Sequence, residues 1–274
     1  MKLTIGRRVM QNFLGKITKG DVLSIDVQEA RKEWAQYRAA YGGFAPIAVP
    51  LLTPPSGNLK LAKTQSYGLS LAQSTVSGYN VCAYSTAECR KYCVATAGKG
   101  SMPSVTRARA VKTQFLADRP FLFMRLLVDE MQRAHRKHDG DVVFRLNTFS
   151  DLPWEEIVPW LFDMFSDVQF YDYTKNEGRA QNFDGKVPSN YRLAYSMSET
   201  DAWQQVAMHL VAVGNVAIVF DLKPTQEMPS EWRGFPVVDA DKSDRWMLDH
   251  DRVIGGLRAK GSMRNSGSPM VQQF

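Results

Sequence analysis

The chain has 274 residues, of which 44% are hydrophobic and 23% are charged, and its net charge is +6. This composition is typical of a soluble globular protein with one large or two small domains, and no apolar run reaches the length of a membrane helix. Three cysteines, an odd number, argue against a secreted disulfide framework. They favour a reducing, cytoplasmic compartment and a metal or redox role.

Residues 1–60 are predicted to form an N-terminal extension: a basic lead-in, a helix over residues 27–41 that ends at a glycine pair, and an extended linker rich in proline and glycine. The lead-in shows no signal-peptide pattern. Its first twenty residues contain bases and no acid, and the chain after Asp251 again carries only bases. Such ends attract phosphates or simply keep a surface soluble, and both interpretations stay open. The bases concerned are Lys2, Arg7, Arg8, Lys16, Lys19, Arg252, Arg258, Lys260 and Arg264.

From residue 61 to 262, strands alternate with helices, which indicates a mostly parallel sheet. Strands are predicted at 64–71, 142–148, 168–174, 191–197, 215–221, 235–239 and 252–258, and helices at 104–117, 120–137, 153–165 and 199–214. About seven strands is one fewer than a closed (β/α)₈ barrel requires. The predicted fold class is therefore α/β, a partial (β/α) barrel similar to a TIM barrel, with a doubly wound open sheet as the alternative. Residues 263–274 are predicted to be a C-terminal tail.

The three cysteines, Cys82, Cys89 and Cys93, lie together on the predicted loop after the first strand of this region. Thiolates are favoured ligands of iron, and three of them can hold a [4Fe-4S] cluster with one iron left open for a small molecule. Three alternatives stay open: a zinc ion with a fourth ligand from His or Asp, buried apolar thiols, or one reactive thiol. None of the four histidines has zinc-finger spacing to the cysteines.

A cysteine trio at this place, with Tyr92 directly before Cys93, resembles the radical S-adenosylmethionine (SAM) enzymes. The usual spacing in that family is Cys-x3-Cys-x2-Cys, whereas here six and three residues separate the cysteines. The resemblance implies a radical SAM-like barrel and a cluster that reduces bound SAM. It also implies an enzyme that abstracts hydrogen from a substrate.

A second resemblance is to a group of uncharacterised bacteriophage proteins, over roughly residues 63–261. It is carried by the cysteine cluster and by three later segments: RLNTFSD (145–151), VVDADKSDRWMLD (237–249) and GLRAKG (256–261). The resemblance implies a location in the cytoplasm of the host cell.

The radical SAM resemblance implies that SAM lies at the C-terminal mouth of the barrel, where the loops after the strands carry the site of a β/α barrel. The residues expected to bind the cofactor are Tyr92, Asn147, Thr148, Ser150, Ser196, Ser198, Arg258 and Lys260. Those expected to act on the substrate are Tyr173, Lys175, Asp221 and Asp239. Simpler roles stay open for some of them: Ser150 and Asp151 as helix caps, and Asp221 as a turn residue.

Two functions follow as hypotheses. The first is a radical SAM-type enzyme with a [4Fe-4S] cluster and SAM as cofactors. The second is a phage nucleic-acid-associated binding protein with a structural zinc or iron–sulfur site. A hybrid of the two, an enzyme that modifies nucleic acid or nucleotides, also stays open, and no membrane partner is expected. No phosphate-binding loop or nucleophile elbow is present, which disfavours nucleoside triphosphatases and hydrolases.

Overall fold

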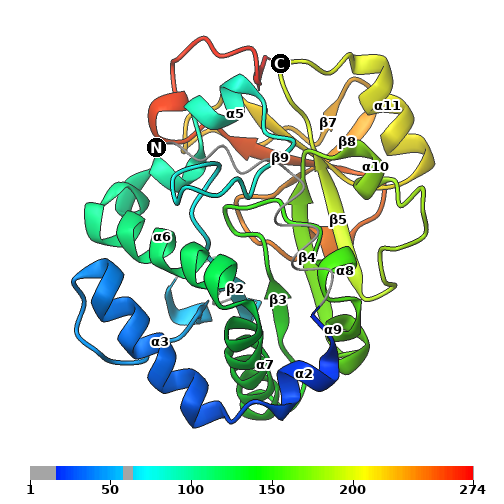
Figure 1. The fold of residues 1–274 in the computed structure, drawn as a ribbon. Helices are drawn as coiled ribbons and strands as arrows, with labels where there is room; N and C mark the ends of the chain where they lie inside the picture. Colours follow the sequence, from blue (N-terminus) through cyan, green and yellow to red (C-terminus); the bar gives the residue numbers. More distant parts are fainter. Residues whose placement is uncertain (1–16, 58–63, 274) are drawn as a thin grey trace.

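The computed structural model describes residues 17–57 and 64–273 and has the mixed α/β architecture that the alternation predicted (Figure 1). Its strands form one sheet in the order β1-β2-β3-β4-β5-β6-β9-β8-β7, and β10 pairs with β6. The two edge strands, β1 and β7, do not pair with each other in the described part of the chain. The sheet is therefore open.

All seven predicted strands are present, and neighbouring members of this set pair in parallel. They are β2 (Ser66–Leu69), β3 (Val143–Arg145), β4 (Gln169–Thr174), β5 (Tyr191–Ser196), β6 (Val216–Phe220), β8 (Phe235–Asp239) and β9 (Ile254–Arg258). The short strands β1 (Leu52–Thr53) and β7 (Glu231–Trp232) add antiparallel edges. Because the seven strands are parallel, their carboxyl ends share one edge of the sheet, which we call the carboxyl edge.

The helices predicted over 27–41, 104–117, 120–137 and 199–214 are present, and the described chain has further short helices. Together the helices are α2 (Lys19–Ser24), α3 (Val27–Gly42), α5 (Ala87–Lys91), α6 (Pro103–Asp118), α7 (Pro120–Lys137), α8 (Trp154–Ile157), α9 (Pro159–Met164), α10 (Glu177–Ala180), α11 (Trp203–Ala212) and α12 (Trp246–Asp249). The single helix predicted over 153–165 is wrong, because the chain breaks it into α8 and α9 at Val158. Proline has no N–H and disfavours helical geometry in the residue before it, so Pro159 ends the first helix and begins the second.

The two faces of the sheet are covered differently. On one face of the sheet, Phe144 and Phe170 pack against the layer formed by α6, α7 and α9. The opposite face packs Tyr171 against Trp246 of α12. Glycine is required at position 255 on that face, because a Cβ there would lie 2.4 Å from the Trp246 ring. The long helices thus lie on one side, and the short segment between β8 and β9 covers the other.

The C-terminal segment enters the sheet at the carboxyl edge. Strand β10 (Val271–Gln272) pairs with Val219 and Phe220 of β6, whereas β5 pairs with the start of β6. Since β9 occupies the other side of β6 along its whole length, β10 takes the place that β5 leaves. This brings the C-terminal segment beside α5, as Figure 1 shows near its top. There the Ser268 hydroxyl donates to Glu88 across 2.5 Å.

The N-terminal helices α2 and α3 lie against α7 and α6 (Figure 1). The side chain of Asp26 begins α3 by accepting from two backbone N–H groups, and Gly43 ends it in the left-handed conformation with φ of 61°. Lys2, Arg7, Arg8 and Lys16 of the basic lead-in lie outside the described residues. Over the described ranges, no helix combines the length and the apolar character that crossing a bilayer requires.

Candidate functional site

Cys82 is anchored between the loops that follow β2 and β3. Its sulfur accepts the backbone N–H of Ser74 at 3.3 Å and donates to the carbonyl of Phe149 at 3.5 Å. The backbone N–H of Asp151 donates to the carbonyl of Val81, 2.8 Å away, beside the cysteine. These contacts fix Cys82 at the carboxyl edge of the sheet, as the sequence predicted.

Cys89 lies on α5, a short helix that is held from the far side by Glu199. The Thr86 hydroxyl caps the helix by accepting the backbone N–H of Cys89 at 3.2 Å. The same hydroxyl donates to the Glu199 carboxylate at 2.7 Å, and that carboxylate also accepts the backbone N–H of Glu88 at 3.2 Å. Cys89 and Tyr92 pack against a cluster from the C-terminal segment, which consists of Ala259, Met263 and Met270.

Cys93 precedes the 3₁₀ turn η2 (Val94–Thr96) and lies near the buried guanidinium of Arg109. Arg109 is 3% exposed and donates from Nη2 to the carbonyls of Ala95 (3.1 Å) and Gly100 (2.8 Å). Its guanidinium also lies 4.9 Å from the centre of the Phe149 ring. Arg109 forms no ion pair with a carboxylate among the residues that the structure describes, so its charge is met by backbone carbonyls and by the Phe149 ring.

The three thiols are free and partly buried. Burial raises the pKa of all three, to about 12 for Cys82. The charges of Cys89 and Cys93 add to the rise at Cys82, which places the three groups within electrostatic reach of one another. Three cations oppose the rise: Lys175 and Arg90 lower the pKa of Cys89, and Arg109 lowers that of Cys93. Binding of iron would therefore have to displace protons from the thiols.

Three residues next to the anchors of the cysteine site carry a buried side-chain polar atom that has no hydrogen-bond partner within the described residues. The atoms are Oε1 of Gln73, Oγ1 of Thr148 and Nε of Arg109. Gln73 and Thr148 directly precede Ser74 and Phe149, the two residues that hold the sulfur of Cys82. A buried polar atom that makes no hydrogen bond is costly.

Within residues 17–57 and 64–273, no three His, Cys, Asp or Glu side chains come together in a way that could hold a metal ion.

Among the residues expected to bind the cofactor, those after β3 have different surroundings. Asn147 and Ser150 are engaged within their own turn: Asn147 Oδ1 accepts the Ser150 hydroxyl at 2.8 Å and the backbone N–H of Leu152 at 2.9 Å. Asn147 Nδ2 donates to the Leu152 carbonyl at 3.0 Å. Thr148 differs, since its buried hydroxyl makes no hydrogen bond in the described chain.

Of the residues expected at the ends of β4 and β5, only Lys175 contacts another member of the set, Ser196, in the described chain. Lys175 donates from Nζ to the carbonyls of Ser196 (2.8 Å) and Met197 (2.7 Å). Ser198 is tied to Asp201 through both its N–H and its hydroxyl. The hydroxyl of Tyr173 accepts the indole N–H of Trp246 at 3.0 Å, which directs Tyr173 to the α12 side of the sheet.

The expected residues at the ends of β6, β8 and β9 are occupied by one another or by the C-terminal segment. Arg258 binds both carboxylate oxygens of Asp239, at 2.9 and 3.1 Å. Lys260 pairs with Asp241 at 2.7 Å. Asp221 accepts the side-chain amide of Gln273 at 3.2 Å. The guanidinium and ammonium groups predicted to bind an anionic ligand are thus neutralised by internal carboxylates.

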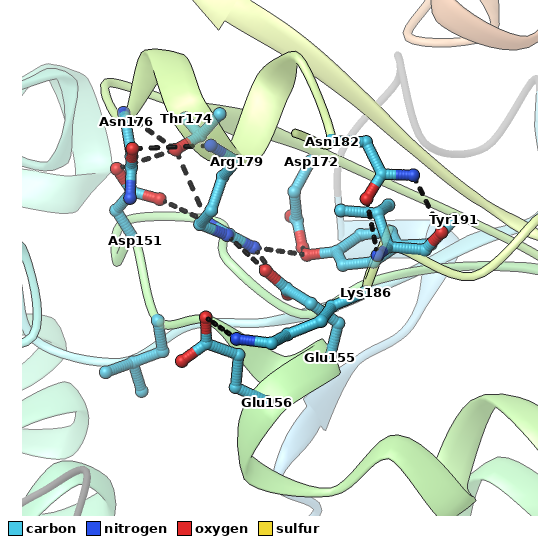
Figure 2. Close-up of polar contacts among 12 residues, drawn as sticks. Asp151, Glu155, Glu156, Asp172, Thr174, Asn176, Arg179, Asn182, Lys186 and Tyr191 are labelled. Atoms are coloured by element: carbon cyan, nitrogen blue, oxygen red, sulfur yellow. Dashed lines mark hydrogen bonds and ion pairs between the residues drawn. The ribbon is translucent and has the colours of Figure 1, made fainter. Parts of the chain in front are cut away.

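A buried polar network beside the cysteine loop was not predicted from the sequence (Figure 2). At its centre Arg179 of α10 binds Asp151 at 2.6 Å and Glu155 at 2.6 and 2.9 Å. Next to it, Asp172 accepts the hydroxyl of Tyr191 at 2.8 Å. Burial raises the pKa of Asp172 to about 7. The only signal in the sequence was Asp151, which was interpreted as a helix cap.

A cleft of about 260 Å³ lies at the opposite end of β5, where that strand begins. Its lining includes Asn182, Arg192 and Asn215. None of the predicted site residues lines it, so it is separate from the cysteine site.

Comparison with known protein families gives a match over most of the chain. The model of the family described as GP88, Gene product 88, matches residues 50–270. No curated protein and no solved structure gives a match.

Proposed function

The chain belongs to the Gene product 88 family, and we propose that it is an iron–sulfur protein in which Cys82, Cys89 and Cys93 hold a [4Fe-4S] cluster. We further propose that it is a radical SAM-type enzyme. The phage character of the family is consistent with the resemblance to bacteriophage proteins and with action in the host cytoplasm.

One observation carries the proposal. Three free, partly buried thiols from a single loop lie within electrostatic reach of one another at the carboxyl edge of a parallel sheet. Gln73, Thr148 and Arg109, next to the anchors of the site, carry buried polar atoms that have no partner among the described residues. Thiolates suit iron, and the unpartnered atoms suit a polar molecule bound beside it.

The order of the strands supports the radical SAM interpretation. Strands β2 to β6 are adjacent in chain order, and the long helices between them pack on one face. This arrangement resembles part of a β/α barrel, and the cysteine loop follows its first parallel strand. In such barrels the loops at the carboxyl edge carry the chemistry.

When bound, the cluster would supply the electron that cleaves SAM. The protein's own side chains would prepare the site for it. Tyr92, Met263 and Met270 cover Cys89 and limit access of water. Lys175 and Arg109 place positive charge beside the thiolates. The hydroxyl of Thr148 and the amide oxygen of Gln73 offer hydrogen bonds to a polar ligand.

Metal analysis tests the first part of the proposal. Anaerobically purified protein should contain iron and acid-labile sulfide and absorb in the visible range, and Cys89→Ser should lose most of both. Ser85→Ala, in the same loop, is the control and should retain them. Zinc in place of iron, or equal metal content in Cys89→Ser and the wild type, would reject the cluster.

Incubation with SAM and a strong reductant tests the second part. A radical SAM-type enzyme should bind SAM and cleave it slowly even without substrate, and Thr148→Ala should bind SAM more weakly while it keeps its iron. If the protein holds a complete cluster but neither binds nor cleaves SAM, the radical SAM assignment is rejected. The protein would then be an iron–sulfur protein of another kind.

A further inference from the structure

Two segments without acidic residues meet around the cysteine site. Residues 89–117 contain six bases and no acid, and residues 252–274 contain four bases and no acid. The structure packs them together: a Cβ on Gly261 would lie 3.1 Å from that of Ala97. The apolar contacts of Cys89 and Tyr92 with Met263 and Met270 extend this junction. Some of these bases are buried or paired within the protein, among them Arg109, Lys112 and Arg258. The exposed bases of the two segments that lie near the junction are the ones available to a partner.

Five exposed bases surround the junction, and we call them the basic rim: Arg90, Lys91, Lys99, Lys260 and Arg264. Lys91 and Lys260 are partly neutralised by Glu88 (3.8 Å) and Asp241 (2.7 Å). The guanidinium of Arg90 donates to Ser85. Arg90, Lys99 and Arg264 form no ion pair with any carboxylate in the described part of the chain. Three cations of the rim thus remain available to an anionic partner.

Exposed apolar side chains lie in the same stretch of the chain as these bases. Tyr84 is 43% exposed, and Val94 and Met102 are each 50% exposed. A surface that combines arginine and lysine with an aromatic ring can bind the phosphates of a single-stranded nucleic acid and stack its bases.

We propose that the basic rim binds nucleic acid. We also propose, on the basis of the proposed function, that nucleic acid is the substrate presented to the cysteine site. The thiols are partly buried behind the rim, so a substrate must reach inward from the surface. A nucleotide of a single strand can be turned out of the strand toward partly buried groups, whereas a flat lipid surface cannot reach them.

Fluorescence anisotropy with a labelled single-stranded oligonucleotide tests the surface, over a series of salt concentrations. Arg264→Glu and Lys99→Glu should each weaken binding several-fold. They should also reduce the salt dependence by about 0.7 in the log–log slope for each phosphate that the variant no longer neutralises. The matched controls are Arg136→Glu at the end of α7 and Lys32→Glu on α3. Each control reverses the charge of an exposed base that lies away from the rim, and both variants should bind the oligonucleotide like the wild type.

Three results would overturn the proposal: no binding by the wild type, equal losses in the rim and control variants, or tighter binding to phosphatidylserine vesicles than to the oligonucleotide. Failure of the proposed function gives a different result. In that case the protein lacks iron and sulfide, yet the rim variants still bind nucleic acid more weakly than the wild type. The proposal that the basic rim binds nucleic acid would then be retained, and the proposal that nucleic acid is the substrate would be rejected.

Discussion

Arg179 and Asp151 form an ion pair with an N–O distance of 2.6 Å, and both side chains are almost completely buried. The second oxygen of Asp151 accepts the backbone N–H of Lys175 at 2.9 Å. Asp151 follows β3, and its own N–H binds the carbonyl of Val81, next to Cys82. The pair therefore connects α10 and the end of β4 to the loop that carries the first cysteine.

Arg179→Met should strongly destabilise the protein, because it leaves the carboxylates of Asp151 and Glu155 buried without their cation. Removing one member of a buried ion pair costs about 3–5 kcal/mol. Chemical denaturation monitored by circular dichroism measures this loss. The control is Lys186→Met, since Lys186 pairs with Asp184 and Glu156 at the surface. An exposed pair contributes about 1 kcal/mol or less, so equal losses in the two variants would contradict the assigned role of Arg179.

Asp172 should make stability fall as the pH rises from about 4 to about 7. Burial raises its pKa in the folded protein to about 7, although Arg145, Arg179, Tyr191 and the backbone of Asn147 all favour the charged form. When the pKa of a group is higher in the folded than in the unfolded protein, protonation of that group stabilises the fold. The stabilisation is complete at pH values below the unfolded pKa. This contribution is lost as the pH rises through the folded pKa. The loss should be on the order of a few kcal/mol.

Unfolding free energies measured across this pH range, for the wild type and for Asp172→Asn, test the expectation. The substitution disturbs hydrogen bonds to Asn147 and Tyr191 at every pH, so the informative quantity is the slope with pH. Asp172→Asn should have a smaller slope than the wild type. Parallel curves would show that Asp172 does not titrate in this range.

The sequence predicted the parallel core well because long alternating segments carry a strong periodic signal. Strands β1, β7 and β10 were missed, since a strand of two residues has no period. Nothing in the sequence pattern indicates that β9 lies between β6 and β8. That order places Arg258 beside Asp239. Two residues predicted as separate ligand contacts are therefore partners of each other.

The cysteine site was predicted from the spacing of the cysteines, but the residues that hold the cysteine loop in place were not predicted. Glu199 and Ser268 contact the α5 region from more than a hundred residues away, and no local pattern indicates such a contact. Arg179 lies on a four-residue helix, too short to show a buried face. Asn147 and Ser150 were correctly placed at a strand end, but they form bonds within their own turn. Only the folded structure shows that the Thr148 hydroxyl, unlike the side chains of Asn147 and Ser150, has no hydrogen-bond partner among the described residues.

Glu199→Ala should loosen the helix that carries Cys89. The carboxylate accepts from the Thr86 hydroxyl and from the backbone of Glu88, so its removal leaves the first turn of α5 without these two bonds. Alkylation of the reduced, metal-free protein followed by mass spectrometry should show Cys89 reacting several-fold faster than in the wild type. Cys82, held by Ser74 and Phe149, is the internal control and should react at an unchanged rate. Equal acceleration at both cysteines would indicate general unfolding instead.

Arg109→Gln should make the reduction potential of the proposed cluster more negative. A cluster held by thiolates carries net negative charge, and reduction by one electron increases it. A buried cation beside Cys93 stabilises the reduced form, and its removal disfavours reduction. A tenfold change in a one-electron equilibrium corresponds to about 59 mV, and we expect a shift of that order. Arg109→Lys keeps the charge and should shift the potential less.

Arg38→Gln is the matched control for this measurement. Arg38 is also buried, donates to backbone carbonyls and lies over aromatic rings, those of Trp34 and Phe44. It is on α3, and no cysteine contributes to its pKa, whereas Cys93 acts on that of Arg109. Both substitutions should lower stability, but only Arg109→Gln should move the potential in a redox titration. An unchanged potential in an Arg109→Gln protein with full iron and sulfide would show that Arg109 supports the loop through its hydrogen bonds and not through its charge.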